Sequence, residues 1–377
     1  MDKQIILAVA GAGKTYYICH EIDPQKRNLI LAFTHENIHN IKDELIDAWG
    51  QIPKLTTVMT FDSFVYRYFI CPYEPTIASH FGKDHFRSKG ITTIDPPSRI
   101  IKRNGRNIPN PKYRNKDQLE HYITSGDQYY CSSISELVMV VKKGRKSLLK
   151  RAATRLNLFY DRIFIDEFQD FREHDYDLIV GLSNILNSVL LVGDYYQHSV
   201  SATNNSGKPF KNKRSDVTYV DFVAELKRQK FDVDEITLNK SRRCSNDICG
   251  FIKEKLQINI ESAELNTGKV KWITDDQVEA ILQNPGILKL VYQEASNYSF
   301  DAMNWSYSKG DTVDAVCVIL TEKFENLDMD EFSLAGIPIP TINKLYVAMT
   351  RSKGDLFLIK ASIFKKYKTA YYARDSQ

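Results

Sequence analysis

The eight residues Ala8-Val9-Ala10-Gly11-Ala12-Gly13-Lys14-Thr15 decide the fold of this chain, because they form a small residue, four variable residues and Gly-Lys-Thr. In such a loop the backbone N–H groups curl around the β-phosphate of a nucleotide, the lysine reaches the β- and γ-phosphate oxygens, and the threonine hydroxyl binds Mg²⁺. The apolar run Ile5–Val9 predicts a strand before the loop, and a helical stretch follows it, as the loop requires. The sequence therefore predicts a nucleotide site formed by Ala10, Gly11, Ala12, Gly13, Lys14, Thr15 and Tyr16.

Apolar runs and helical patterns alternate along the rest of the chain. Short runs rich in large apolar residues predict further strands at Leu29–Phe33, Arg162–Ile165, Val189–Val192, Ile287–Tyr292, Ala315–Leu320 and Leu356–Ile359. Apolar residues at helical spacing predict a helix that reaches Trp49 and another between the strands near residues 165 and 189. Strands that alternate with helices imply an α/β fold with a parallel, doubly wound sheet.

Two adjacent carboxylates follow one of these strands. Asp166-Glu167 comes directly after the apolar run Ile163-Phe164-Ile165. In a P-loop protein, an acid pair at this position predicts that Asp166 holds Mg²⁺ and that Glu167 orients and deprotonates the attacking water. Adjacent acids outside such a context are usually surface residues.

Length and composition fit a globular protein of two ordinary domains, since the chain has 377 residues of which 43% are hydrophobic. No apolar run approaches the roughly 20 residues that cross a bilayer, and the phosphate loop occupies the place of a signal peptide. The six cysteines form no CxxC pair and no His-Cys cluster. We therefore predict a cytoplasmic protein without a membrane partner, a zinc site or a disulfide framework.

Basic charge is concentrated in one part of the chain. Residues 83–116 carry ten Lys or Arg against two acids, and residues 142–155 carry seven without an acid. Together with several prolines, this charge marks an insertion at about 72–155, and the polar run Thr203–Ser215 is a candidate linker. The charge indicates a polyanionic partner, with Lys102, Arg103 and Arg106 as candidate phosphate contacts. The alternative is a solvated face, which is the commoner meaning of charge runs.

Seven motifs, in order, resemble those of superfamily 1 helicases of the UvrD/Rep/PcrA type. They are LAFT at 31–34, TFDSF at 60–64, DEFQD at 166–170, GDYYQ at 193–197, LNKSRRCSNDI at 238–248, SKG with Thr312 and Asp314 at 308–314, and LYVAMTRSK at 345–353. The resemblance implies two tandem RecA-like P-loop domains at 1–210 and 211–377, each a parallel sheet with helices on both faces. The insertion lies in the first, and the second has no large insertion.

The resemblance also implies ATP and Mg²⁺ as cofactors and assigns roles to residues. Gln197 senses the γ-phosphate, Arg243 contacts it and Arg351 is the arginine finger, so that these three join Lys14 and Glu167 in the catalytic set. Arg242, stacked on adenine, and Gly310 join the nucleotide-binding set. The implied nucleic-acid contacts are Phe33, Thr34, His35, Thr60, Phe61, Ser63 and Ser308.

The sequence departs from the family pattern at several positions. Val200 and Ala202 stand where a Tyr and a Trp stack on bases, Asp62 replaces a His, and Thr312 replaces a Glu. Only about fifty residues separate Ile248 from Asn304, where larger members carry an extra subdomain. The compact form is similar to the UvrD-like helicase subunits of Gabija-type antiviral defence systems in bacteria.

Three functional hypotheses follow. The leading one is a nucleic-acid-dependent NTPase that couples ATP hydrolysis to translocation on single-stranded or partly duplex DNA, with duplex unwinding as an extension. The second is a nucleotide- and DNA-sensing regulatory subunit that controls a partner nuclease without processive unwinding. The third, a small-molecule P-loop kinase, explains the phosphate loop and nothing else.

Overall fold

The computed structural model describes residues 2–103, 105–143, 146–198, 208–211, 215–306 and 312–372. They form two compact units. The first comprises Met1–Ile5, Thr15–Val192 and Ser201–Val233, and the second comprises Ile6–Lys14, Gly193–Val200 and Asp234–Gln377. The phosphate loop up to Lys14 thus belongs to the second unit by its contacts. Most of the predicted linker, Thr203–Ser215, lies outside the described residues.

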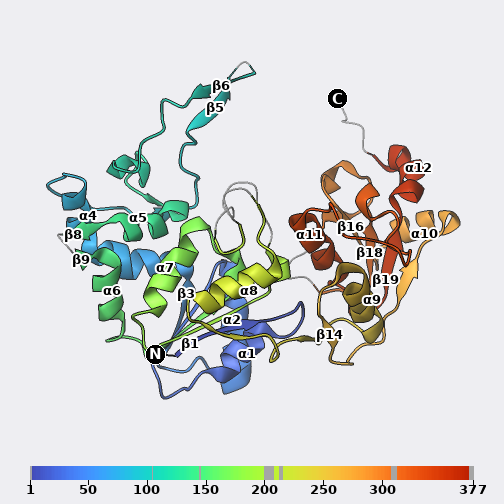
Figure 1. The fold of residues 1–377 in the computed structure, drawn as a ribbon, viewed down its shortest axis with the longest axis horizontal. Coiled ribbons are helices and arrows are strands. Elements are labelled where there is room, and N and C mark those ends of the chain that lie inside the picture. The colour runs from blue at the N-terminus through green and yellow to red at the C-terminus, as the bar shows by residue number, and fades with distance from the viewer. Residues whose placement is uncertain are drawn as a thin grey trace. The chain divides into compact units, whose positions relative to one another are not determined.

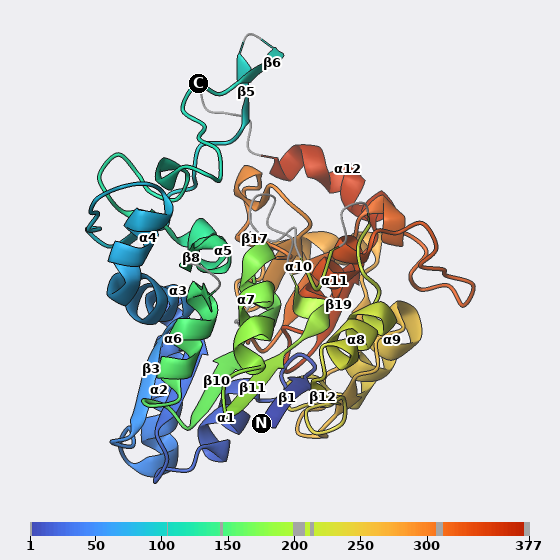
Figure 2. The same ribbon diagram turned by 60° about the vertical axis from the view of Figure 1, so that its left-hand side comes forward.

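The first unit is built on a six-stranded sheet in the order β12-β1-β11-β10-β2-β3. Figure 1 labels β1 and β3 of this sheet, and Figure 2 also labels β10, β11 and β12. Its strands are β1 (Asp2–Leu7), β2 (Asn28–Ala32), β3 (Thr56–Thr60), β10 (Arg162–Asp166), β11 (Ser188–Gly193) and β12 (Asp232–Asp234). β10 pairs in parallel with β11 and β2, and β2 pairs in parallel with β3. Central strands buried on both faces need continuous apolar runs, and Leu29–Leu31 and Phe164–Ile165 are fully buried.

Helices flank this sheet (Figure 2). They are α1 (Lys14–Glu21), α2 (His35–Trp49), α3 (Phe61–Val65), α6 (Leu148–Leu156), α7 (Glu173–Ser183) and α8 (Tyr219–Arg228). α2 buries Ile38, Ile41 and Leu45 on one face. It ends at Gly50, whose left-handed backbone, with φ of 74°, lets its N–H bond to the Ile46 carbonyl.

Between β3 and β10 the chain forms the basic insertion. Its remaining elements are α4 (Glu74–His80), α5 (Ile134–Val140), β4 (Ile91–Thr92), β5 (Ile100–Arg103), β6 (Arg106–Pro109), β7 (Tyr129–Tyr130), β8 (Lys142–Lys143) and β9 (Lys146–Ser147). Tyr122 and Tyr129 are fully buried and form a small core for this region. The antiparallel hairpin β5–β6 extends away from the sheet of the first unit (Figure 2).

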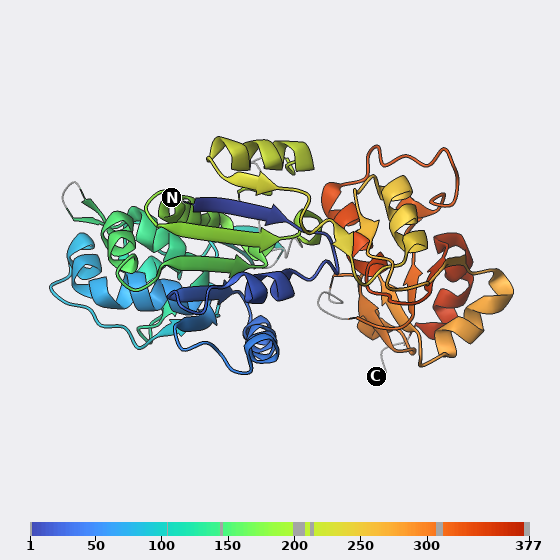
Figure 3. The ribbon, with the colours of Figure 1, turned by 90° about the horizontal axis from the view of Figure 1, so that it is seen from below.

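The second unit has a parallel five-stranded sheet in the order β15-β19-β18-β16-β17. Its residues beyond Asp234 run from yellow to red in Figure 3. Its elements are β13 (Lys240–Ser241), β14 (Glu261–Ser262), β15 (Val270–Trp272), β16 (Leu288–Val291), β17 (Ala302–Asn304), β18 (Val316–Ile319), β19 (Leu356–Ile359), α9 (Asn246–Leu256), α10 (Val278–Gln283), α11 (Ile339–Met349) and α12 (Ala361–Tyr371). Val316, Cys317, Leu356 and Ile359 are fully buried at its centre.

Three backbone segments of the second unit approach one another at two glycines. A Cβ atom on Gly268 would lie 1.8 Å from the Gly354 carbonyl oxygen, and one on Gly354 would lie 2.3 Å from the Asp314 carbonyl oxygen. Real Cβ contacts are never so short. Both positions therefore require glycine, whereas a Cβ on Gly250, in α9, would meet nothing within 4 Å.

The predicted α/β class with parallel sheets flanked by helices is confirmed. β1 ends at Leu7 rather than at Val9, and the Val9 N–H bonds to the Leu238 carbonyl, which lies outside the sheet of β1. The predicted domain boundary at residue 210 stays a prediction. No helix within the described ranges is long and apolar enough to span a membrane.

Candidate active site

The side chains of Thr15 and Asp166 meet in the first unit, although 151 positions separate them in the sequence. Thr15 Oγ1 donates a hydrogen bond of 2.8 Å to Asp166 Oδ2. Thr15 lies in the first turn of α1 and Asp166 is the last residue of β10, where it is buried. A hydroxyl and a buried carboxylate oxygen are hard donors of the kind that Mg²⁺ takes from proteins. The pair therefore fits the predicted metal.

Glu167 follows in an uncommon backbone conformation. Its φ is 56°, in the left-handed region, and its N–H donates to Asp166 Oδ1 at 2.9 Å. Gln169, which is fully buried, donates from Nε2 to Glu167 Oε2. Non-glycine residues rarely adopt this conformation, and it persists where the surroundings hold it, often at functional sites. Glu167 is only half-buried, so its carboxylate can meet water.

The first half of the phosphate loop is held by backbone bonds in the second unit. Ala8 N–H donates to the Gly193 carbonyl at 2.8 Å, and Val9 N–H donates to the Leu238 carbonyl at 2.9 Å. The Gly11 carbonyl also accepts a hydrogen bond, from the Arg242 N–H of the same unit. The loop limb Ala8–Gly11 is therefore fixed by segments that lie far away in the sequence.

Gly11 is the point of closest approach in this limb. Arg242 N–H donates to its carbonyl at 2.9 Å. Its φ is 73°, and a Cβ at this position would lie 2.7 Å from Arg243 Cβ. Gly13 has a φ of 85°, immediately before α1 begins at Lys14. Gly11 and Gly13 thus adopt backbone conformations with positive φ, which residues with a Cβ atom adopt only at a cost in conformational free energy.

The hydroxyl of Tyr346 joins the loop to a buried carboxylate. It accepts from Ala10 N–H at 2.7 Å and donates to Asp194 Oδ2 at 3.1 Å. Asp194 Oδ1 accepts from Tyr196 N–H at 3.0 Å. Burial and the Asp194 charge raise the pKa of Tyr346 well above its usual value, so the hydroxyl stays protonated. The sequence showed Tyr346 only as part of LYVAMTRSK; its long-range contacts left no separate signal.

Two arginines of the second unit lie near the end of α11. Arg243 Nη1 donates to the Thr350 carbonyl at 3.0 Å, and Arg351 Nε donates to the Val347 carbonyl at 2.7 Å. Burial and the charge of Arg243 lower the pKa of Arg351 to about 10, which still leaves it charged at neutral pH. The predicted γ-phosphate sensor Gln197 is buried in the same unit.

A family model described as an AAA domain matches residues 2–203, which is more than half of the chain. The chain belongs to the AAA domain family. None of the curated proteins is similar enough to this AAA domain protein to count as a match.

Among solved structures, this AAA domain protein is similar to a PRRSV helicase, with 14% identity, a TM-score of 0.44, and coverage of 98% of this chain and 54% of that chain. Arterivirus nonstructural protein 10 (helicase) gives 13% identity, a TM-score of 0.44, and coverage of 98% and 62%. The complex of that helicase with DNA has 13% identity to this chain and a TM-score of 0.44, with coverage of 96% of this chain and 62% of that chain. The chain spans only about half to three fifths of these proteins.

The predicted nucleic-acid residues follow β2 and β3 of the AAA domain protein. Thr34 caps α2 by accepting from Asn37 N–H at 3.1 Å, and Thr60 caps α3 by accepting from Ser63 N–H at 3.3 Å. These N-cap bonds stabilise the first turns of α2 and α3, so both threonines have a structural role in addition to the predicted contact with nucleic acid. Phe61 is fully buried, and Phe33 stacks on it with ring centroids 5.3 Å apart. His35 is exposed, and so are the predicted nucleotide-binding residues Tyr16 and Arg242.

Asp62 is paired within the AAA domain protein, which explains its presence in TFDSF. Arg172 donates to both Asp62 oxygens and, from Nε, to Asp175 Oδ2 at 2.9 Å. Ser135 Oγ donates to the other Asp175 oxygen at 2.5 Å. Asp62 thus belongs to a largely buried charge network between α3, α5 and α7.

Glu136 of α5 lies in a second charged cluster. Its carboxylate contacts Lys116, and the Nε2 atoms of His121 and His174 lie 3.7 Å and 3.4 Å from its oxygens. Burial opposes ionisation of Glu136, but the hydrogen bonds and positive charges of these three groups outweigh it and lower its pKa to about 2.

Lys102, Arg103 and Arg106 are exposed on the β5–β6 hairpin, where Arg103 is the register partner of Arg106. Ser308 and Gly310, as well as Val200 and Ala202, lie outside the described residues.

Proposed function

We propose that this protein is a nucleic-acid-dependent NTPase of the superfamily 1, UvrD-like helicase type, which uses ATP and Mg²⁺. The hydrogen bond between Thr15 and Asp166 carries the proposal, because it unites the phosphate-loop motif and the DEFQD motif in one site. The membership of residues 2–203 in the AAA domain family supports it. A P-loop kinase does not account for the DEFQD and LYVAMTRSK motifs.

In the proposed reaction, Lys14 binds the β- and γ-phosphate oxygens, and Thr15 and Asp166 hold the metal. Mg²⁺, when bound, neutralises charge on the phosphates. Glu167 orients the attacking water and accepts its proton, while Gln169 fixes the Glu167 carboxylate. Arg243 and Arg351 stabilise the negative charge that develops on the γ-phosphate during transfer, and Gln197 senses whether the γ-phosphate is present.

The nucleotide roles are tested by two variants with different expected defects. Lys14→Ala should lose both nucleotide affinity and hydrolysis, because it removes phosphate-binding charge. Glu167→Gln should bind nucleotide normally and yet hydrolyse at least about a hundredfold more slowly, as expected when a general base is lost. Lys54→Ala, an exposed site, is the control. Wild-type turnover of Glu167→Gln would show that Glu167 is not the base.

The proposed partner is single-stranded or partly duplex DNA, bound in part by Lys102, Arg103 and Arg106. Their triple reversal to Glu should weaken binding and flatten its dependence on salt, since each phosphate contact contributes a log–log slope of about −0.7 on single strands. Hydrolysis without DNA should not change, because these residues are remote in sequence and structure from Thr15 and Asp166.

A matched control reverses three exposed lysines elsewhere, Lys26, Lys54 and Lys253. It changes the net charge equally and should leave the salt slope unaltered. If both triple variants lose affinity alike, only net charge matters and the hairpin is not a binding surface.

The second candidate is a nucleotide- and DNA-sensing subunit that controls a partner nuclease, as in Gabija-type defence. Val200 and Ala202, which replace the stacking aromatics of the family, favour it. Strand displacement separates the two candidates: DNA-stimulated hydrolysis with displacement supports a motor, and stimulation without displacement supports the sensor.

A further inference from the structure

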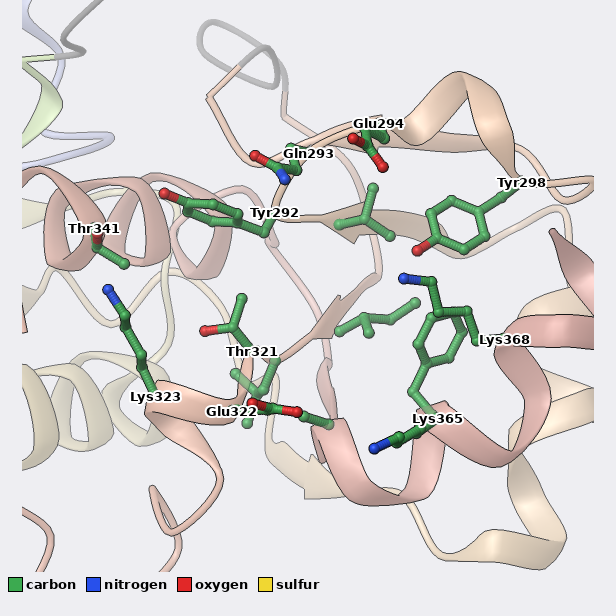
Figure 4. A pocket seen from close by; sticks show the side chains of 15 residues that line it. Tyr292, Gln293, Glu294, Tyr298, Thr321, Glu322, Lys323, Thr341, Lys365 and Lys368 are labelled. Carbon is green, nitrogen blue, oxygen red and sulfur yellow. The ribbon is translucent and has the colours of Figure 1, made fainter.

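A cavity of about 520 Å³ lies in the second unit, at the carboxyl ends of β16 and β18 (Figure 4). The strand order β18-β16-β17 shows that the chain leaves β16 to one side for β17 and returns to the other side for β18. In open parallel sheets, ligands bind where the strand order reverses in this way. No residue given a role in hydrolysis above lines the cavity.

The floor of the cavity is apolar. It is formed by the buried side chains of Val291, Ile319, Leu320 and Phe364. Tyr292, which follows β16, lies half-buried along one wall. A flat apolar group of a ligand would lie against this surface, and cavities of about 300–1,000 Å³ suit small ligands.

Lysines supply the positive side of the cavity. Lys323, Lys365 and Lys368 line it, and within the described ranges none of them has a carboxylate within 4 Å. Two other lysines of the same region are neutralised, since Lys366 pairs with Asp275 at 3.1 Å and Lys360 pairs with Asp328 at 2.7 Å. α12 therefore presents its unneutralised lysines to the cavity.

Figure 4 shows the Lys368 ammonium and the Tyr298 hydroxyl pointing toward the same part of the cavity. Two acids, Glu294 and Glu322, also line the rim. Glu294 accepts a hydrogen bond of 3.4 Å from Tyr372, outside the lining, so part of its charge is engaged there. The donors Lys368 and Tyr298 together fit an anionic oxygen.

Thr321 adds an independent sign of a missing ligand. Its Oγ1 atom is buried and makes no hydrogen bond within the described part of the molecule. Buried hydroxyls are nearly always hydrogen-bonded, so an exception at a cavity wall calls for a partner. Because this atom is buried, a ligand oxygen or N–H group in the cavity would reach it only after the Thr321 side chain rotates.

We propose that this cavity binds a nucleotide unit, with its phosphate at Lys368 and Tyr298 and its base on the apolar floor beside Tyr292. The chemistry is shared by a free mononucleotide and by one nucleotide of a single strand. This site is separate from the phosphate loop, and its occupancy does not depend on hydrolysis.

The test measures binding of thymidine monophosphate and of an eight-residue oligothymidylate to the full chain with two sets of changes: Lys14→Ala, which silences the phosphate loop, and the triple reversal of Lys102, Arg103 and Arg106, which removes the DNA contacts proposed for the hairpin. Lys368→Glu should weaken binding of the occupying ligand at least about tenfold, the loss of one charge-assisted hydrogen bond. Lys366→Glu, on the same helix, should bind as the parent does. Preference for the monophosphate or for the oligonucleotide identifies the source, and either result supports the proposal.

Thr321→Val keeps the shape of the side chain and removes the unpartnered hydroxyl. It should weaken binding severalfold and yet unfold at the same or a higher temperature, a combination that a purely structural role does not give. The proposal is overturned if neither ligand binds, if Lys366→Glu and Lys368→Glu are equivalent, or if inorganic phosphate binds as tightly as the monophosphate. Failure here leaves the proposed hydrolysis intact, because Glu167→Gln tests that separately.

Discussion

Replacing Tyr346 by phenylalanine should both destabilise the protein and weaken its nucleotide site. The change removes a single oxygen, which accepts from Ala10 N–H and donates to Asp194. Ala10 and Asp194 are fully buried, so water cannot take the place of the hydroxyl. A buried polar group without its partner costs roughly 1–3 kcal/mol. Asp194 keeps its bond from Tyr196, and we therefore expect a total loss of about 2–4 kcal/mol.

Urea unfolding of the purified variant measures this loss, and nucleotide titration measures its consequence for the loop. The limb Ala8–Gly11 keeps its backbone bonds but loses its side-chain bond, so ordering it on binding should cost about 1–2 kcal/mol, or roughly 5–30-fold in affinity. Tyr367→Phe is the control, because it removes an exposed hydroxyl that bonds to the Asp275 carbonyl. It should change stability by less than about 0.5 kcal/mol.

Two results would refute the reasoning. If Tyr346→Phe is as stable as the wild type, the hydroxyl does not satisfy two buried groups. If it is less stable but binds nucleotide normally, Tyr346 supports the core without positioning the loop.

Arg351→Ala should keep nucleotide affinity within a few-fold and reduce kcat by about a thousandfold or more, as for an arginine finger; normal turnover contradicts that role. Arg172→Met should cost roughly 3–5 kcal/mol in urea unfolding, because Asp62 and Asp175 are left buried without their shared cation. Adding Asp62→Leu should restore only part of this loss, since Asp175 still lacks the cation; an unchanged midpoint speaks against a buried ion-pair network. Folding lowers the pKa of Glu136 from 4.5 to about 2, so its ionised carboxylate contributes stability that is complete above pH 4.5 and is lost as the pH falls through 2. Glu136→Gln should therefore flatten the fall in unfolding free energy between pH 4.5 and about 2. Parallel pH curves for variant and wild type would exclude this contribution.

Strands β2, β10 and β18 were predictable from the sequence because they are buried on both faces and therefore read as apolar runs. β3, β12, β15 and β17 were not predicted, because they are only partly buried and lack such a run. The meeting of Thr15 and Asp166 was predictable as well, since each occupies a motif with a fixed place relative to its strand. The bond from Ala10 to Tyr346 was not, because it depends on chain segments 336 positions apart.

The role of Asp62 also depends on a contact between segments that lie far apart in the sequence. Its departure from the family motif is visible in the sequence, but its reason is Arg172, and no local pattern links the two. The cavity beside β16 likewise depends on residues from several elements that lie far apart in the sequence, and no local pattern marks it.

The close approach of Gly268, Gly354 and Asp314 sets a limit on natural variation. A library that substitutes every residue should retain no side chain at positions 268 and 354, because the obstacle is backbone rather than a side chain that can move. Position 250 should accept alanine freely and even gain stability, since a helix favours alanine over glycine by about 1 kcal/mol. Related sequences in which 268 and 354 both carry side chains must therefore connect these three segments differently, so the two glycines can serve as a test of whether a distant relative shares this architecture.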